Sequence, residues 1–154
     1  RRSSDLNIST KGRYGIRALL EIAVHGASGQ AVPLSIIAEH QDISEGYLEQ
    51  IMASLRKAGV VKGIKGPQGG YQLANPPQMV AIVKVLEILE GDLFHVDEDP
   101  SQTSDGELMQ LCISQNLWEP MAAALREAIG AVTLKDLLDR YLQMRDASAM
   151  MYYI

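Results

Sequence analysis

The chain has 154 residues, of which 47% are hydrophobic, so it can bury a core of ordinary size and is not expected to be disordered. Its net charge of −5 is uneven: residues 1–75 hold nine basic and six acidic residues, whereas residues 76–154 hold five basic and thirteen acidic ones. The single cysteine excludes an intrachain disulfide framework, and no signal peptide or bilayer-length apolar run is found, so the cytoplasm is the expected compartment.

Two helices are predicted at the amino-terminal end of the chain. The first follows Ser9-Thr10, either of which could cap it, and ends near Gly26. Its basic residues Lys11 and Arg13 are either phosphate contacts or ordinary solvated charges. The second runs from Leu34 to about Gln41, with Ser35 as a possible cap.

A third helix is predicted after the turn at Asp42-Ile43, with Ser44 as its N-cap and Gly59 at its end. Its apolar stripe consists of Leu48, Ile51, Met52 and Leu55. This stripe leaves polar residues near the N-terminus on the outer face, where a recognition helix contacts base edges. Glutamine can pair with adenine and glutamate with cytosine, although a solvated helix face would show the same pattern.

A short β-hairpin is predicted next, from residues 60–65 and 71–74. Its connection, Gly66-Pro67-Gln68-Gly69-Gly70, permits a sharp turn and a close approach to another surface. Lys62 and Lys65 add positive charge, so this arm could enter a minor groove. A phosphate-binding loop is not indicated, because the GxGxxG spacing and a following helix are both missing.

In the second half of the chain, the apolar pattern predicts a nearly all-apolar helix over residues 79–90 and a long helix over 108–129. Between them lies an acidic stretch, residues 92–107. The acidic stretch is interpreted as a mobile functional loop or as plain disorder. Thr133 and Asp136 form an acidic variant of the capping box that opens a last helix. A small winged domain needs no such extra helices for its own core, so they predict a homodimer interface.

Together these elements predict a mainly α fold with a small β-hairpin wing: a winged helix-turn-helix followed by C-terminal dimerisation helices. The expected units are a DNA-binding domain (7–75), a connecting core helix (76–91), an acidic sensor-type loop (92–107), dimerisation helices (108–146), and tails at 1–6 and 147–154.

Several ordered motifs resemble one family. They are Ile8-Ser9-Thr10-Lys11-Gly12-Arg13-Tyr14, Ile43-Ser44 with Tyr47-Leu48-Glu49-Gln50, Leu55-Arg56-Lys57-Ala58-Gly59, and Gly66-Pro67-Gln68-Gly69-Gly70-Tyr71. The resemblance is to the Rrf-type winged-helix regulators. It implies a dimeric bacterial transcription factor that binds an operator in double-stranded DNA and is expected to repress transcription. Its activity is expected to be controlled by a small-molecule effector or a regulatory protein.

The expected DNA-binding residues fall into three groups. The amino-terminal group, assigned to phosphates by the resemblance, is Ser9, Thr10, Lys11, Arg13 and Tyr14; the recognition-helix group is Ser44, Glu45, Tyr47, Glu49, Gln50 and Arg56; the wing group is Lys62, Lys65, Gly66, Pro67, Gln68, Gly69 and Gly70. Lys65 stands where the family usually has arginine. Gly46 stands where other members can carry a DNA-contacting side chain.

The sequence departs from the cluster-binding members of the family at the sensor. Those members carry three cysteines spaced six apart, and here only Cys112 matches, while the earlier positions hold Pro100 and Gly106. Gln115 stands where a histidine ligand can occur. Neither proline nor glycine ligates iron, so no cofactor is expected and the chain is placed in the cluster-less branch, which contains the cysteine-metabolism repressor.

Other interpretations stay open. Cys112 is a redox switch or a small buried hydrophobic residue. His95 is a metal ligand with Asp97 or Asp99, or a solvated loop residue, and His25 and His40 are too scattered in sequence to help. The alternative functions are an iron–sulfur, metal or redox sensor that uses atypical ligands including Cys112, and a winged helix that docks a protein. An enzyme is not indicated, because the sequence shows no nucleophile–base pair, no metal-ligand cluster and no phosphate loop.

Overall fold

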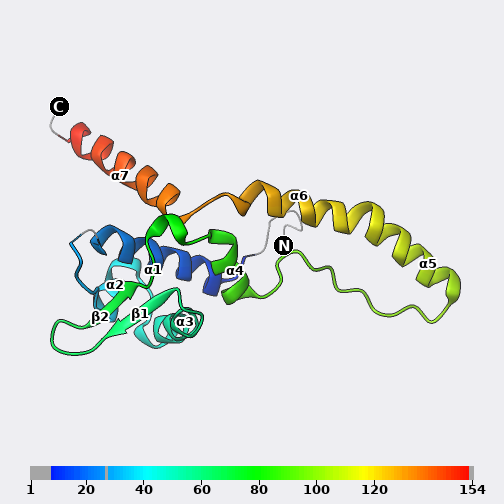
Figure 1. The fold of residues 1–154 in the computed structure, drawn as a ribbon, viewed down its shortest axis with the longest axis horizontal. Helices are drawn as coiled ribbons and strands as arrows, with labels where there is room; N and C mark the ends of the chain where they lie inside the picture. Colours follow the sequence, from blue (N-terminus) through cyan, green and yellow to red (C-terminus); the bar gives the residue numbers. More distant parts are fainter. Residues whose placement is uncertain (1–7, 27, 153–154) are drawn as a thin grey trace.

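The computed structural model describes residues 8–26 and 28–152. It consists of a winged head (residues 8–26, 28–91 and 131–152) and a long helical arm (residues 92–130) that projects from it (Figure 1). The expected tail at 1–6 and Asn7 lie outside the described residues. The elements in chain order are α1 (Thr10–Gly26), α2 (Leu34–Gln41), α3 (Glu45–Lys57), β1 (Val61–Ile64), β2 (Gly70–Leu73), the 3₁₀ turn η1 (Pro77–Met79), α4 (Ile82–Glu90), α5 (Ser104–Ile113), the π-helical turn η2 (Ser114–Trp118), α6 (Glu119–Gly130) and α7 (Leu134–Met151).

Helix α1 forms the centre of the head, because α2, α3, α4 and α7 all pack against it. The predicted apolar stripe of α3 is fully buried there, together with Leu19 and Ile22 of α1. Ser44 caps α3 as predicted, since its side chain accepts a hydrogen bond from Tyr47 N. The expectation for Ser35 is wrong: α2 begins at Leu34 after an extended Pro33, so Ser35 lies inside the first turn and caps nothing.

The wing is a two-stranded antiparallel sheet in which Val61 pairs with Leu73 and Ile64 with Gly70. Val32, which precedes α2, pairs with Tyr71 through two backbone hydrogen bonds of 2.8 and 2.9 Å. Gly70 has a φ of +150° and lies directly against the Val32 backbone, where a Cβ would have no room. Strand β1 is one residue shorter at each end than the predicted 60–65, and β2 begins and ends one residue earlier than the predicted 71–74.

Helix α4 begins three residues later than predicted. Pro77–Met79 form the 3₁₀ turn, and Val80-Ala81 are extended because they pair with the residues that lead into α7. Ile82 N donates to Val132 O at 3.0 Å, and Leu134 N donates to Val80 O at 2.8 Å. Helix α4 is packed between α1, α3 and α6, as its apolar sequence predicts.

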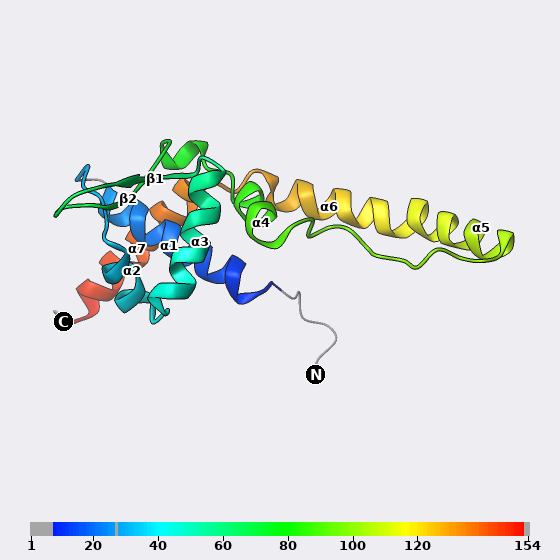
Figure 2. The same cartoon turned by 90° about the horizontal axis from the view of Figure 1, so that it is seen from below.

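The arm consists of the chain running outward over residues 92–103 and returning as α5, η2 and α6 (Figure 2). The predicted helix over 108–129 is present, but it begins at Ser104, because Thr103 Oγ1 accepts from Gly106 N and caps it. The expected loop therefore ends at 103 rather than 107. The π turn ends two residues before Pro120, whose missing N–H cannot continue a regular α-helical ladder.

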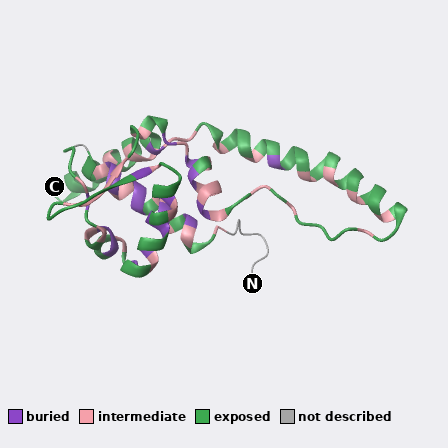
Figure 3. Ribbon diagram, turned by 60° about the horizontal axis from the view of Figure 1, so that its bottom comes forward, coloured by how far each residue is buried: buried purple, intermediate pink, exposed green. Residues whose placement is uncertain are grey.

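Helix α7 opens with the predicted capping box of Thr133 and Asp136. It continues to Met151, so the expected boundary of a tail at 147 is wrong. Burial is concentrated in the head, whereas most of the arm is exposed (Figure 3). Every helix in the described part of the chain is too short or too polar to cross a bilayer.

Candidate nucleic-acid interface

Helix α3 presents its first two turns to solvent. Glu45, Glu49 and Gln50 are exposed, while Leu48 and Ile51 on the opposite face are buried. The buried stripe fixes the rotation of the helix, so the exposed polar residues are held on one outer face. This is the geometry that a reading helix needs.

The amino-terminal end of α1 is joined to the start of α3 by hydroxyl and ring contacts. Thr10 Oγ1 and Tyr47 Oη are hydrogen bonded at 3.0 Å, and the rings of Tyr14 and Tyr47 meet edge to face, with their centroids 6.0 Å apart. The guanidinium of Arg13 lies 5.8 Å from the centroid of the Tyr14 ring. These contacts join the amino-terminal group of expected DNA-binding residues to the recognition-helix group. Tyr47 is half-buried between the two groups, so it fixes their spacing as well as exposing part of its surface.

Arg17 was not among the expected site residues, yet it links α1 to the helix-turn-helix. Its Nη2 donates to Gln41 O at 2.6 Å and its Nε to Gln41 Oε1 at 3.1 Å. It also lies over the Tyr14 ring at 5.3 Å. A cation at the last carbonyls of α2 satisfies groups that the helix leaves open. Arg17 therefore fixes α2 and the turn that follows relative to α1.

Glu90 is the second residue that the sequence did not indicate. Its Oε1 accepts from Ser9 Oγ at 2.6 Å and from the backbone N of Gly12 at 2.9 Å. Gly12 is the third residue of α1, whose N–H normally takes a bond from the capping side chain. The expected cap by Ser9 or Thr10 is thus replaced by a carboxylate from the end of α4, and Ser9 donates to that carboxylate instead.

The approach of α4 to α1 depends on glycine. A Cβ at Gly12 would collide with Glu90, and a Cβ at Gly15 would collide with Leu89. The start of α1 is therefore anchored to the last turn of α4, the residues that lead directly into the arm.

The wing extends on the other side of α3 (Figures 1 and 2). Gly66 has a φ of +110°, and Gly69 N donates to Gly66 O at 2.9 Å, so the predicted glycine turn is present. Lys62, Lys65, Pro67 and Gln68 are exposed along it. Helix α3 thus lies between the wing and the amino-terminal group, on one side of the head.

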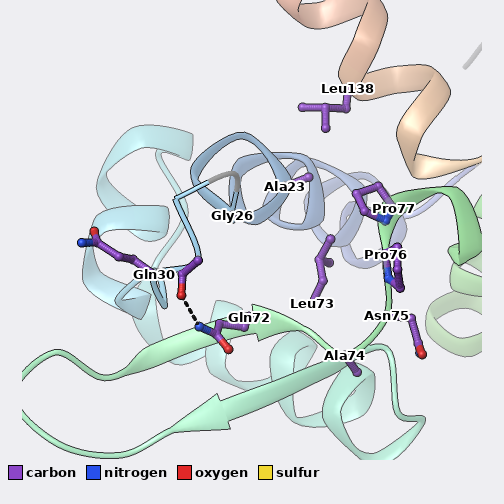
Figure 4. Close-up of a pocket in the computed structure, with 11 residues that line it drawn as sticks. Ala23, Gly26, Gln30, Gln72, Leu73, Ala74, Asn75, Pro76, Pro77 and Leu138 are labelled. Carbon is purple, nitrogen blue, oxygen red and sulfur yellow. Dashed lines mark hydrogen bonds between the residues drawn. The ribbon is translucent and has the colours of Figure 1, made fainter.

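A mostly apolar cavity of about 470 Å³ lies behind the wing. It is enclosed by the end of α1, the strand β2 and Leu138 of α7, with Leu73 directed into it (Figure 4). Gln72 Nε2 closes one edge by donating to Gly29 O at 2.9 Å. The cavity borders the base of the wing, away from the exposed face of α3.

The sensor positions in the arm do not fit an iron–sulfur cluster. Cys112 is exposed in the protomer, with its Sγ 3.9 Å from Asn116 Nδ2, so the interpretation as a residue buried within one chain is wrong. Gly106 is packed against Ser101 and Thr103, and even a Cβ there would collide with both side chains. One thiolate per chain is too few for a cluster of the cysteine-ligated kind.

The histidines are arranged differently from the expectation. His95 Nε2 lies 3.0 Å from Asp97 Oδ1, and both side chains are largely exposed. His25 and His40 are not scattered: both contact Glu21 of α1. Sequence separation concealed this meeting, because His25 follows Glu21 by one helical turn whereas His40 belongs to α2.

The chain was compared with known proteins. The family model described as "Rrf2: Iron-dependent Transcriptional regulator" matches residues 8–140. The transcriptional regulator CymR of Bacillus subtilis is 35% identical over 153 residues, covering 97% of this chain and 100% of that protein. Protein rrf2 of Nitratidesulfovibrio vulgaris is 37% identical over 146 residues, covering 93% and 90%.

Solved structures agree with these matches. The structure of CymR, described as the global cysteine regulator of B. subtilis, aligns with a TM-score of 0.71 and 33% identity, covering 87% of this chain and 97% of that one. The IscR of T. potens aligns with a TM-score of 0.68 and 36% identity, covering 88% of each chain. From the family model, the relatives and the shared fold, the chain belongs to the Rrf2 family of winged-helix transcriptional regulators.

Proposed function

We propose that the chain binds operator DNA as a homodimer, with α3 in the major groove and the glycine-rich wing in the adjacent minor groove. The single observation that carries this proposal is the position of α3 between two basic groups on one side of the head. Such a surface can contact a groove and the phosphates on both sides of it at once.

Base discrimination is assigned to Glu49 and Gln50, which are exposed in the first turns of α3. A bidentate glutamine contact distinguishes adenine from other bases by about 1–3 kcal/mol. Ser44, Glu45 and Arg56 flank them on the same helix or its cap. Tyr47, whose hydroxyl is bonded to Thr10, would set the spacing between the major-groove contacts and the phosphate contacts.

Salt-dependent affinity is assigned to Lys11 and Arg13 at the start of α1 and to Lys62 and Lys65 on the wing. Each neutralised phosphate releases counterions, so it steepens the slope of the logarithm of the binding constant against the logarithm of the salt concentration by about 0.9. Lysine at 65 supplies charge without the planar fork of arginine, so minor-groove recognition would rest on charge and on the Gly66–Gly70 turn.

Dimerisation is assigned to α7 and, above all, to the arm. Its helices expose large apolar side chains in the protomer, including Leu108, Met109, Leu111, Leu117 and Met121, whose exposed fractions range from 43% to 67%. Large apolar side chains left exposed along successive helices favour a protein–protein interface. A second copy is the partner that closes the surface, because two reading heads match the two half-sites of an operator.

This assignment divides the chain into a reading unit (residues 7–75), a connecting helix (76–91), a sensor-type stretch up to 103, and dimerisation helices that extend to Met151. The dimer would act as a repressor in the cytoplasm by occupying its operator. An effector would act by changing the spacing of the heads, and the contact of Glu90 with the start of α1 offers one route.

A protein-docking winged helix is the competing function, and one experiment separates the two. A pool of duplexes with a randomised centre is selected through several rounds on the purified full-length chain. We expect an enriched inverted repeat whose half-site centres lie about one helical turn apart. Failure to enrich any sequence, with no salt-dependent affinity for the pool, would refute the proposed function.

A further inference from the structure

Three metal-ligating side chains meet on the face of the head formed by α1 and α2. Glu21 and His25 lie one turn apart on α1, and His40 lies near the end of α2. Glu21 Oε1 is 3.0 Å from His25 Nε2 and 2.6 Å from His40 Nδ1. One carboxylate oxygen therefore faces two imidazole nitrogens from two different helices.

Glu21 is an ionised carboxylate in this arrangement. Partial burial raises its pKa, but hydrogen bonds from His40, Gln41 and His25 outweigh burial, so the pKa lies below its ordinary value. Because an ionised carboxylate only accepts hydrogen bonds, both imidazoles donate to it in the absence of a ligand. The carboxylate side chain is only 12% exposed, whereas His25 and His40 are about half exposed.

We propose that Glu21, His25 and His40 form a binding site for a divalent first-row transition metal ion. Two imidazole nitrogens and one carboxylate oxygen are the ligand set that such ions take in proteins, with the remaining position left to water. The ligand atoms of the three residues all lie within 4.8 Å of one another. This site is separate from the arm, where the family resemblance places its cluster ligands.

The change needed to admit an ion is small. Zinc ligands at about 2.0–2.1 Å in tetrahedral geometry lie roughly 3.3 Å from one another, so the imidazoles need to retreat by less than about 1 Å. Each neutral ring also moves its N–H to the outward nitrogen, which frees the inward nitrogen to ligate. The rings border a cavity of about 500 Å³, so this movement has space.

The groups behind the ligands hold the carboxylate in place. Gln41 Nε2 donates to Glu21 Oε2 at 2.7 Å, and Arg17 in turn donates to Gln41. Partners of this kind orient a ligand and sharpen metal affinity. Arg17 is a nearby cation, but its guanidinium is bound to the carbonyl and side chain of Gln41 rather than directed at the histidines.

A bound ion would join the last turn of α2 to the middle of α1. It would therefore stabilise the folded head by mass action, since the unfolded chain does not hold the three ligands together. Binding and stabilisation are both measured without DNA, so they are independent of the proposed function.

The test uses Co²⁺ as a coloured probe on the full-length chain with a Cys112→Ser substitution, which removes the single thiol as an alternative ligand. Visible absorption should saturate at one Co²⁺ per chain, and Zn²⁺ should displace the colour. His40→Ala and Glu21→Gln should each weaken Co²⁺ binding by more than the roughly 10–100-fold that loss of an outer partner costs. His95→Ala is the matched control and should change nothing.

Circular dichroism establishes that each variant is folded. His25→Gln, at a half-exposed position on the helix surface, serves as a second ligand variant. Undiminished Co²⁺ binding in His40→Ala and His25→Gln would overturn the proposal, as would loss of binding in His95→Ala. A rise in the unfolding temperature with Zn²⁺ that disappears in His40→Ala would support it.

Discussion

The contact between Glu90 and the start of α1 predicts a measurable loss of stability on Glu90→Ala. The substitution removes the acceptor for Gly12 N at 2.9 Å and for Ser9 Oγ at 2.6 Å. A hydrogen bond to a charged group contributes about 1.5–3 kcal/mol, but the Ser9 bond is exposed and water can replace it. A negative charge at a helix N-terminus adds about 0.3–1 kcal/mol. The expected loss in the free energy of unfolding is therefore roughly 2–4 kcal/mol.

Glu90→Gln separates the hydrogen bonds from the charge. It keeps an oxygen where Oε1 lies and should cost only about 1 kcal/mol, mainly from the lost charge. Urea unfolding measures both variants at one fixed protein concentration, because the stability of the proposed dimer would depend on concentration. Ser9→Ala, which removes only the exposed bond, is the control and should cost less than the alanine variant.

The same variants report on DNA binding. Without its cap, the start of α1 should fray, so Glu90→Ala should bind DNA more weakly than the wild type. Glu90→Gln keeps the helix end ordered and removes a negative charge near the phosphates, so it should bind at least as tightly. Equal stabilities for Glu90→Ala and the wild type, or equal effects of the two substitutions, would refute the assigned role.

Three further predictions concern the arm, the wing and the pH dependence. Met121→Asp should convert the proposed dimer to a monomer in sedimentation equilibrium, because it places a charge among the exposed apolar side chains of α6. Met79→Asp, at an exposed position in the head, should leave the dimer intact. A dimer that persists in Met121→Asp would exclude this face as the interface. Lys62→Ala with Lys65→Ala should weaken binding to all duplexes alike and lower the salt slope by about 2; an unchanged slope would remove the wing from the phosphates. The lowered pKa of Glu21 implies stability that is present above pH 4.5 and lost as the pH falls through the lower folded value. With a chelator present, the stability deficit of Glu21→Gln should therefore shrink below pH 4.5, and a deficit independent of pH there would contradict the assignment.

Signals confined to a few neighbouring residues were readable from the sequence. Ser44 with the stripe of α3, the glycine turn of the wing, and the Thr133–Asp136 capping box all depend on residues within one or two turns of one another. These elements are predictable because the conformation that the local residues favour is also the one that packs in the folded chain. The prediction for Ser35 is wrong because Pro33, in an extended conformation, takes the cap position, so α2 begins two residues earlier than a cap at Ser35 would place it.

Contacts between distant segments were not readable. Glu90 meets Gly12 across 78 residues, and His40 meets Glu21 across 19, so no local pattern marks either pair. A glycine at 12 was a partial signal, since a buried glycine in a helix often marks a close approach. The start of α5 at Ser104 does have a local signal, because Thr103 is a normal N-cap, but the acidic residues around it are more typical of a loop.

The central claim, that α3 reads bases while its neighbours hold phosphates, is tested most directly by Gln50→Ala. Affinities of the wild type and the variant are measured for the selected duplex and for a scrambled duplex at several salt concentrations. We predict a loss of about 1–3 kcal/mol on the selected duplex, little change on the scrambled one, and an unaltered salt slope. Equal losses on both duplexes would contradict the account.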